Sequence, residues 1–431
     1  MNENSRRQLG LVTATAIVIA NMIGTGVFTT SGFLLKDLQS PWRVLAVWLV
    51  GGVMAALGAM CYGALSKKIP ESGGEYIFLS RTLHPAAGYV AGWVCLLVGF
   101  SAPLAAAAYA FGEYAKPWLH DVSPQMAGTI ILLLFAIIHS IDVRGGAWIQ
   151  NFAVALKVLI IGGFVMSAFG NLTPPSQTTP PGDFPWSLFG VSLIWVSFSY
   201  SGWNAAIYIA GEIKNPEKNL PLSLLLGTGV VMLAYILLNA VFVFSAPVEK
   251  LAGQLEIGRI AAASLGGEGW ANVVSAIVAL VLISSVSSMV MAGPRVYAQM
   301  ANDGYLPTIF RQQSGPPRMA IAFQFTLAVV MLWGAAFDSL LTYIGFTLGL
   351  STAATVLGLI KIKLKEGEKL KVPGWPVIPA VFIAAVIAMT CFSVLRRPSE
   401  SLYGFLTIGV GLVFYMFSSN NAKNSTANTQ K

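Results

Sequence analysis

Two short runs of small and polar residues interrupt long apolar stretches, and they are the parts of this chain best suited to bind a charged ligand. The first run spans residues 21–28 and places Gly24 and Gly26 on either side of Thr25. The second run spans residues 197–204 and includes Ser201. Glycine inside a helix costs about 1 kcal/mol relative to alanine, so these runs favour local unwinding.

An unwound helix exposes backbone groups of both polarities. The free N–H groups at the start of one half-helix attract a carboxylate, and the free C=O groups at the end of the other attract an ammonium group. An α-amino acid carries both groups on one carbon atom. The alternative is that the glycines only allow helices to pack closely. Breaks in the first and the sixth apolar stretches, which correspond in an inverted five-plus-five repeat, favour the binding site.

A lysine lies deep inside another apolar stretch, at position 157. A charge at the centre of a bilayer costs at least about 2.5 kcal/mol, so Lys157 is expected to have a partner and a role. We expect its ammonium group to tie the first broken helix to the serine-rich eighth stretch, either as a structural tether or as a group that couples transport to proton loss. The alternative is that Lys157 extends to the membrane edge. The eighth stretch offers Ser284, Ser285, Ser287 and Ser288, and Ser287 and Ser288 are the candidates.

The elements that position these residues are predicted to be membrane helices. Charged residues form 10% of the 431-residue chain, against roughly 25% in soluble domains, and the mean hydropathy is +0.70. About 20 apolar residues are needed to cross the bilayer as a helix. The sequence therefore predicts an all-α integral membrane protein of about twelve spans, at 9–35, 43–66, 86–114, 124–142, 147–169, 187–211, 221–246, 270–300, 317–336, 338–361, 374–395 and 401–418.

The basic residues predict the orientation of these spans. Of the 26 Lys and Arg residues, eighteen fall at the termini and in the even-numbered loops, seven fall on the opposite side, and one is Lys157. Because positive charge is retained in the cytoplasm, both termini are expected there and the protein in the inner membrane. The net charge of +8 is then a signal of topology, and no nucleic-acid partner is expected.

Four motifs resemble the amino acid–polyamine–organocation superfamily, and within it the bacterial relatives of the L-type amino-acid transporters. They are residues 23–28, 69–76, 200–221 and 294–304, and the resemblance extends over essentially the whole chain. It implies a leucine-transporter-type fold with a 5+5 inverted repeat and with helices 1 and 6 unwound in the middle. A single transporter domain would cover 1–420, with repeat one at about 9–169, repeat two at about 187–361 and two extra helices at 374–418. A disordered cytoplasmic tail is expected at 419–431.

The resemblance also implies roles for individual residues. The amides around Thr25 and Gly26 would hold the substrate carboxylate, and Phe198 would act as a gate that covers the substrate from the extracellular side. Lys157 matches the lysine that takes the place of a sodium ion in sodium-independent members. The implied substrate-binding residues are Met22, Ile23, Gly24, Thr25, Gly26, Phe198, Ser199 and Ser201, with the carbonyls of Met22, Ile23, Phe198, Ser199 and Ser201 holding the amino group.

These features predict a sodium-independent secondary transporter of small or medium neutral L-amino acids that works by exchange or by proton coupling. Ser201 stands where many relatives have glycine, which favours smaller substrates. No acidic residue is evident near the expected side-chain pocket, which disfavours a carrier of cationic amino acids or polyamines. That carrier and an amino-acid sensor without net transport remain the alternatives.

Other classes of function receive less support. An enzyme is not expected, because clustered His, Asp or Cys residues are lacking, and no metal or cofactor is expected. The three cysteines (Cys61, Cys95 and Cys391) all lie inside apolar stretches, so no disulfide-linked subunit is expected. The expected partners are the amino-acid substrate and the lipid bilayer, and the oligomeric state is left open.

Overall fold

The computed structural model describes residues 9–141, 146–168, 172, 183–311 and 316–429, and it describes side chains in these ranges except at 146–156, 299 and 419–429. Within these ranges the chain is helical, and its one β-type contact is an isolated bridge between Leu9 and Ile213. The predicted all-α membrane fold is confirmed.

Each predicted span corresponds to a helix or to a broken helix. Eight helices of the described residues are long and apolar enough to cross a membrane, and α1 with α2 forms a ninth span bent by 42°. Shorter apolar helices lie within α8, α9 and α13. The elements are α1 (Leu11–Met22) with α2 (Thr25–Leu38), α3 (Pro41–Lys68), α5 (Pro85–Val94) with η2 (Cys95–Ser101) and α6 (Ala102–Ala115), α7 (Pro124–Ile141), α8 (Gly146–Ser167), α9 (Trp186–Ser199) with η3 (Ala205–Glu212), α10 (Pro216–Phe244), α12 (Ile257–Asn302), α13 (Arg318–Gly334), α14 (Phe337–Glu366), α15 (Val377–Arg396) and α16 (Pro398–Thr429).

Four short elements lie in the connections between spans: α4 (Gly74–Thr82), α11 (Val248–Leu251), η4 (Thr308–Phe310) and η5 (Gly367–Lys369).

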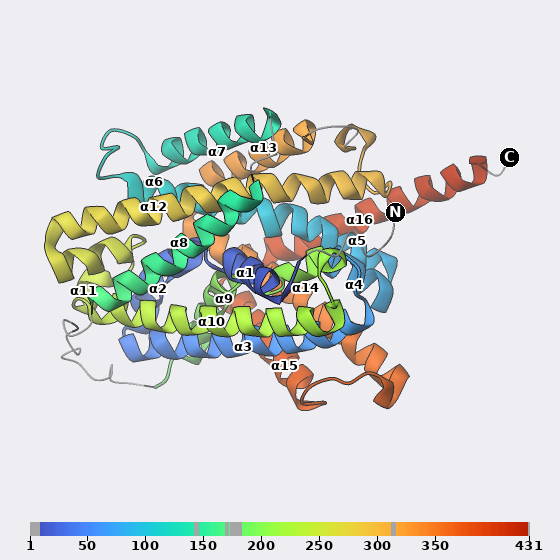
Figure 1. Ribbon diagram of the computed structural model, residues 1–431, viewed down its shortest axis with the longest axis horizontal. Helices are drawn as coiled ribbons and strands as arrows, with labels where there is room; N and C mark the ends of the chain where they lie inside the picture. Colours follow the sequence, from blue (N-terminus) through green and yellow to red (C-terminus); the bar gives the residue numbers. More distant parts are fainter. Residues whose placement is uncertain (1–8, 142–145, 169–171, 173–182, 312–315, 430–431) are drawn as a thin grey trace.

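The helices form two groups around a central core. In Figure 1, α3 and α10 lie side by side along one edge, while α7 and α13 lie along the opposite edge with α12 beside them. The broken helices α1–α2 and α9–η3 lie between these groups, so surrounding helices shield their breaks from lipid, as exposed backbone in a bilayer requires.

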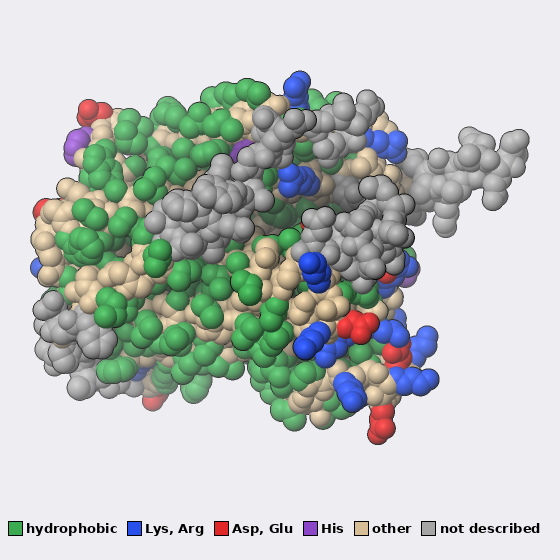
Figure 2. Space-filling view, in the orientation of Figure 1, with side chains coloured by type: hydrophobic (Ala, Val, Ile, Leu, Met, Phe, Trp, Pro, Cys, Tyr) green, Lys and Arg blue, Asp and Glu red, His purple; other side chains and the backbone are tan. Residues whose placement is uncertain are grey.

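The outer surface is apolar around the middle of the molecule. Figure 2 shows hydrophobic side chains over most of the visible face, with Lys and Arg gathered mainly toward the right-hand end. α7 illustrates this surface, because Ile130, Leu133, Leu134 and Ile137 are all exposed on it. A surface of this kind can be stable only against lipid tails.

Two elements differ from the sequence prediction. The span at 86–114 contains a π-helical segment, η2, which the pattern of apolar residues does not reveal. α12 begins at Ile257 because a separate helical segment joins it across a kink at Gly267, whose φ is +76°. α16 is helical as far as Thr429, and the disordered tail expected at 419–431 stays a prediction.

Candidate functional site

The first helix breaks between α1 and α2. Ile23 has an extended ψ of 93°, and Gly24, the N-cap of α2, has φ −137° and ψ −150°. Among the described residues, no side chain caps the start of α2. The amides of its first turn, which begins at Thr25, have no carbonyl four residues earlier in the helix to bond, so they are donors directed at whatever lies before the helix.

The sixth span breaks between α9 and η3. α9 ends at Ser199, a turn follows, and η3 continues as a 3₁₀-helix. Gly202 lies in the turn with φ +97°, and a Cβ atom there would lie 2.6 Å from the Asn21 carbonyl oxygen. The positive φ and this close approach both require glycine at position 202. The close approach also means that the second break packs directly on the end of α1.

The two breaks meet beside a cavity of about 390 Å³. The hydroxyls of Thr30 and Ser199 lie 3.0 Å apart, and a Cβ atom on Gly26 would lie 2.4 Å from Ser199 Oγ. The volume is in the range of sites for small molecules. Ile23 is buried beside the cavity, and the predicted site residues that line it are Met22, Gly24, Thr25, Gly26, Phe198, Ser199 and Ser201.

Lys157 reaches the first break. Its side chain is 5% exposed, and Nζ donates hydrogen bonds to the Ile23 carbonyl at 3.1 Å and to Ser285 Oγ at 3.3 Å. The side chain is therefore directed into the protein and not toward the membrane edge.

The serine that Lys157 reaches differs from the predicted pair. Ser285 makes the contact, whereas Ser287 Oγ lies 2.9 Å from His139 Nε2 and Ser288 Oγ donates to the Ser284 carbonyl. The rotation of α12 about its axis decides which serine of the run faces Lys157, and the sequence does not determine that rotation.

The carbonyls at the end of α1 already have protein donors. The Tyr235 hydroxyl, on α10, donates to the Met22 carbonyl, and Lys157 donates to that of Ile23. A carbonyl oxygen has two lone pairs, so each can still accept a bond from an ammonium group. In the second break, the Phe198 carbonyl accepts the Ser201 N–H at 2.9 Å. Tyr235 is a site residue that no sequence motif marked.

An acidic residue lines the cavity, contrary to the expectation from sequence. Glu75, on α4, is 7% exposed and lies among the lining residues together with Asn204 and Tyr208. Glu75 falls in the connection between the predicted spans at 43–66 and 86–114, and the sequence does not show that this connection folds back against η3. The two glycines before it, Gly73 and Gly74, were the available signal.

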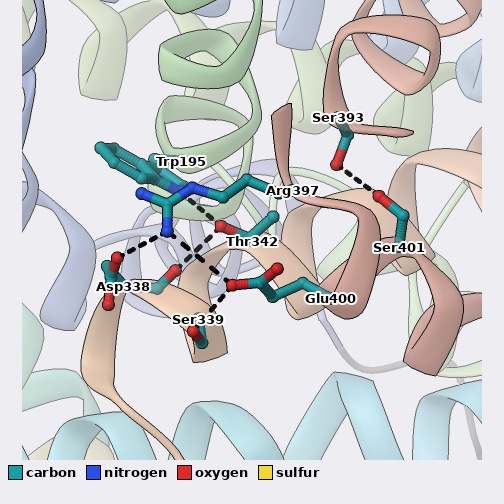
Figure 3. Close-up of polar contacts among 8 residues, drawn as sticks. All are labelled: Trp195, Asp338, Ser339, Thr342, Ser393, Arg397, Glu400 and Ser401. Atoms are coloured by element: carbon teal, nitrogen blue, oxygen red, sulfur yellow. Dashed lines mark hydrogen bonds and ion pairs between the residues drawn. The ribbon is translucent and has the colours of Figure 1, made fainter. Parts of the chain in front are cut away.

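A polar network ties α9 to α14 and to the α15–α16 turn. Figure 3 shows the Arg397 side chain between Asp338 and Glu400, with Trp195 beside it. Arg397 Nη1 lies 3.0 Å from Asp338 Oδ2, and the guanidinium carbon lies 5.5 Å from the centre of the Trp195 ring. Trp195 Nε1 donates to Thr342 Oγ1 at 2.8 Å.

An aromatic layer lies next to this network. The Phe33 ring on α2 lies 6.1 Å from that of Trp195 and 6.0 Å from that of Phe337, at the start of α14. Since Trp195 is one turn before Ser199, α2, α9 and α14 are closed against each other on this side of the site. Among the described residues, no three His, Cys, Asp or Glu side chains are grouped so that they could hold a metal ion.

Comparison with known proteins identifies the family. A family model described as amino acid permease matches residues 9–417. The chain is 28% identical over 429 residues to the human (Homo sapiens) b(0,+)-type amino acid transporter 1, covering 95% of this chain and 87% of that protein, and 30% identical to the rabbit (Oryctolagus cuniculus) protein of that name over the same shares. It is 28% identical over 381 residues to the mouse (Mus musculus) large neutral amino acids transporter small subunit 2, covering 84% of this chain and 71% of that protein. A match over nearly the whole chain, together with two broken helices around a shared cavity, means that this protein belongs to the amino acid permease family.

Proposed function

We propose that this permease exchanges small or medium neutral L-amino acids across the inner membrane by alternating access and without sodium. The observation that carries the proposal is the pair of helix breaks beside one cavity, at Gly24 and at Gly202. The uncapped start of α2 suits the substrate carboxylate. The carbonyls at the end of α1 and around the second break suit the amino group. Phe198 lines the cavity and would cover the bound substrate.

Exchange is favoured over net transport, because net transport requires the carrier to change sides without substrate. Without substrate, the first amides of α2 lack the partner that an amino acid would provide, and closing the cavity around them would leave buried polar groups unsatisfied. Each such group costs roughly 1–3 kcal/mol. An empty carrier would therefore change sides slowly, and a loaded one would change sides readily.

Sodium independence is supported by Lys157. Its ammonium group binds the Ile23 carbonyl and Ser285 Oγ, which are oxygen atoms of the kind that coordinate a sodium ion. A fixed positive charge at that position both occupies the oxygen atoms and repels another cation. We therefore assign Lys157 the role of a structural tether between α1 and α12.

A carrier of cationic amino acids is the second candidate, because Glu75 lines the cavity. A carboxylate has about four acceptor positions, and three of those on Glu75 are taken by Tyr62, Asn204 and Ser351. Counting the described residues, one position is left for a cationic side chain. Neutral substrates are therefore favoured.

The distribution of basic residues supports the cytoplasmic placement of both termini, of the end of α14, where Lys361 and Lys365 are exposed, and of the α14–α15 connection, where Lys371 is exposed. The Arg397 network would then lie toward the extracellular side. Cys391, the exposed cysteine, lies inside α15, in a membrane span, so the proposed transporter works without a disulfide-linked subunit.

The proposal is tested with purified protein in liposomes. Labelled alanine, serine, leucine, phenylalanine and arginine are each supplied outside, with and without the unlabelled amino acid inside, in sodium-free buffer. Uptake of the smaller neutral amino acids that requires internal substrate is expected. Uptake into empty vesicles driven by a proton gradient would replace exchange with symport. Uptake of arginine above that of neutral amino acids would favour the second candidate, and binding of an amino acid without flux would indicate a sensor.

A further inference from the structure

Glu75 is a buried carboxylate held by three helical elements besides its own. Oε1 accepts hydrogen bonds from the Tyr62 hydroxyl on α3 at 2.6 Å and from Asn204 Nδ2, at the start of η3, at 3.2 Å. Oε2 accepts from the Ser351 hydroxyl on α14 at 2.8 Å. Three donors converge on one carboxylate, which is the arrangement expected around its ionised form.

The groups that face this carboxylate include no cation among the described residues. The ion pairs of the described chain leave Glu75 out, and the titratable groups facing it are Tyr62 from α3, Tyr208 from η3 and Cys95 from η2. α14 contributes Ser351, which does not titrate. A buried carboxylate without a cationic partner is costly in its charged form. α4 lies outside the membrane-spanning helices, and burial raises the pKa of the Glu75 carboxyl above its usual range, an effect that the three hydrogen bonds oppose only in part.

The connection containing α4 holds η3 at both of its ends. Glu75 binds Asn204, directly before η3, and the Ser72 hydroxyl accepts the Gly211 N–H at 2.9 Å. Gly74 makes this approach possible, because its φ is +62° and a Cβ atom there would lie 2.3 Å from the Tyr208 ring. Of these two contacts, the one through Glu75 involves a carboxyl group that can gain or lose a proton.

We propose that Glu75 is a proton-binding site that controls the release of η3 from α4 at the cytoplasmic end of the cavity. The inference rests on the proposed transport function and adds a second ligand, the proton, to it. The ionised carboxylate binds all three donors by charge-assisted bonds, which are roughly twice as strong as neutral ones, and it holds η3 in place. Protonation gives Glu75 a hydrogen to donate, which leaves fewer acceptor positions and weakens the bond to Asn204. η3 then separates from α4 more readily, and the loaded carrier exchanges faster.

The sign of the pH effect follows from this arrangement. Below the pKa of Glu75 the carboxyl is neutral and η3 is released more easily, so exchange is fast. Above that pKa the carboxylate holds η3 and exchange slows, by up to about tenfold per pH unit, because the protonated fraction falls by that factor. The pH on the cytoplasmic side of the vesicle membrane is the relevant one.

The test measures amino-acid exchange in liposomes at a series of cytoplasmic-side pH values. Four proteins are compared: the wild type, Glu75→Gln, Ser351→Ala and Glu71→Gln. Glu71 is the matched control, because it lies in the same connection but is exposed and pairs with Arg81 at 3.1 Å. Glu75→Gln cannot ionise and is expected to exchange at the fast rate at every pH. Ser351→Ala removes one donor to the ionised form and is expected to shift the midpoint to higher pH, whereas Glu71→Gln should follow the wild type.

A readout independent of transport accompanies this test. Because burial raises the folded-state pKa of Glu75, a proton stabilises the folded protein. The Tm of the wild type should therefore fall, relative to that of Glu75→Gln, as the pH rises from the ordinary carboxyl pKa through the folded-state pKa. A Tm difference that is constant with pH would overturn the proton site even if no amino acid is exchanged. If the wild type exchanges amino acids and Glu75→Gln shows the same pH profile as the wild type, the proposed proton site is wrong while the transport function stands.

Discussion

Replacing Gly26 with alanine is expected to impair the site. Of the single substitutions that add a methyl group in the first break, we expect this one to have the largest effect. The new Cβ atom would lie 2.4 Å from Ser199 Oγ and 2.6 Å from Ser199 Cα. Ordinary contacts begin near 3.4 Å, so α2 and α9 would have to separate by about 1 Å. Rotation of the serine side chain cannot relieve the clash, because the Cα atom is part of the backbone.

The expected magnitude follows from the cost of overpacking. Inserting a methyl group into a well-packed interior typically costs about 1–3 kcal/mol. If the cost is imposed on the substrate-bound form, in which both breaks must approach the same ligand, affinity falls by roughly 5- to 150-fold. The assay is displacement of a labelled amino acid from detergent-purified protein, with Tm measured on the same samples.

The matched control is Gly162→Ala on α8. Among the described residues outside its own helical turns, a Cβ atom at Gly162 would have no atom within 4 Å, so this substitution adds the same methyl group without a clash against a neighbouring helix. Wild-type affinity is expected for Gly162→Ala. Wild-type affinity in Gly26→Ala would refute the conclusion that the two helix breaks meet at the substrate.

Three further substitutions are expected to separate the roles of the surrounding residues. Lys157→Met removes the donor to the Ile23 carbonyl at 3.1 Å, a bond to a charged group that is typically worth about 1.5–3 kcal/mol, so substrate affinity measured by displacement should fall at least roughly tenfold. Phe198→Ala removes a side chain that lines the cavity, and it should speed release of bound amino acid in a washout assay more than it slows binding. Arg397→Gln breaks a partly exposed ion pair with Asp338, so the Tm should fall only slightly, and by less at high salt than at low salt.

Each of these expectations has an outcome that contradicts it. Lys157→Met with full affinity would mean that the ammonium group does not position the first break. Equal effects of Phe198→Ala on binding and release would argue against a covering role. A fall of Tm after Arg397→Gln that is independent of salt would mean that packing of Arg397 against Trp195, and not its charge, stabilises this end.

The backbone of the site was largely predictable from the sequence. Gly24 and Gly202 mark their breaks because glycine is unfavourable inside a helix, and the apolar lengths locate the spans. The burial of Lys157 was predictable for a similar reason, because its distance from the ends of its span is set by position along the chain.

The contacts between side chains of different helices were less predictable. Ser285, and not Ser287 or Ser288, faces Lys157, because the packing of α12 against its neighbours sets its rotation. Tyr235 lies in the middle of an ordinary apolar span, and its bond to the Met22 carbonyl exists only once α10 packs on α1. The expectation that no acidic residue lies near the pocket was wrong at Glu75, because the sequence of a connection between spans does not reveal that it folds into the protein.

The composition of the motif at residues 72–75 suits its contacts with η3. Ser72 and Glu75 each bind one end of η3, and Gly74 adopts a positive φ so that the chain can approach the Tyr208 ring. The same motif thus positions a carboxylate at the cavity and attaches it to the start of η3.

The central claim is that the start of α2 binds the carboxylate, and the carbonyls of the breaks bind the amino group, of one amino acid. The most direct measurement is competition against uptake of a labelled neutral amino acid by three analogues: the unmodified L-amino acid, its methyl ester and its N-acetyl derivative. The unmodified compound is expected to compete, and both blocked compounds are expected to fail, because each lacks one of the two charges. Competition by either blocked compound that equals competition by the parent would contradict the account.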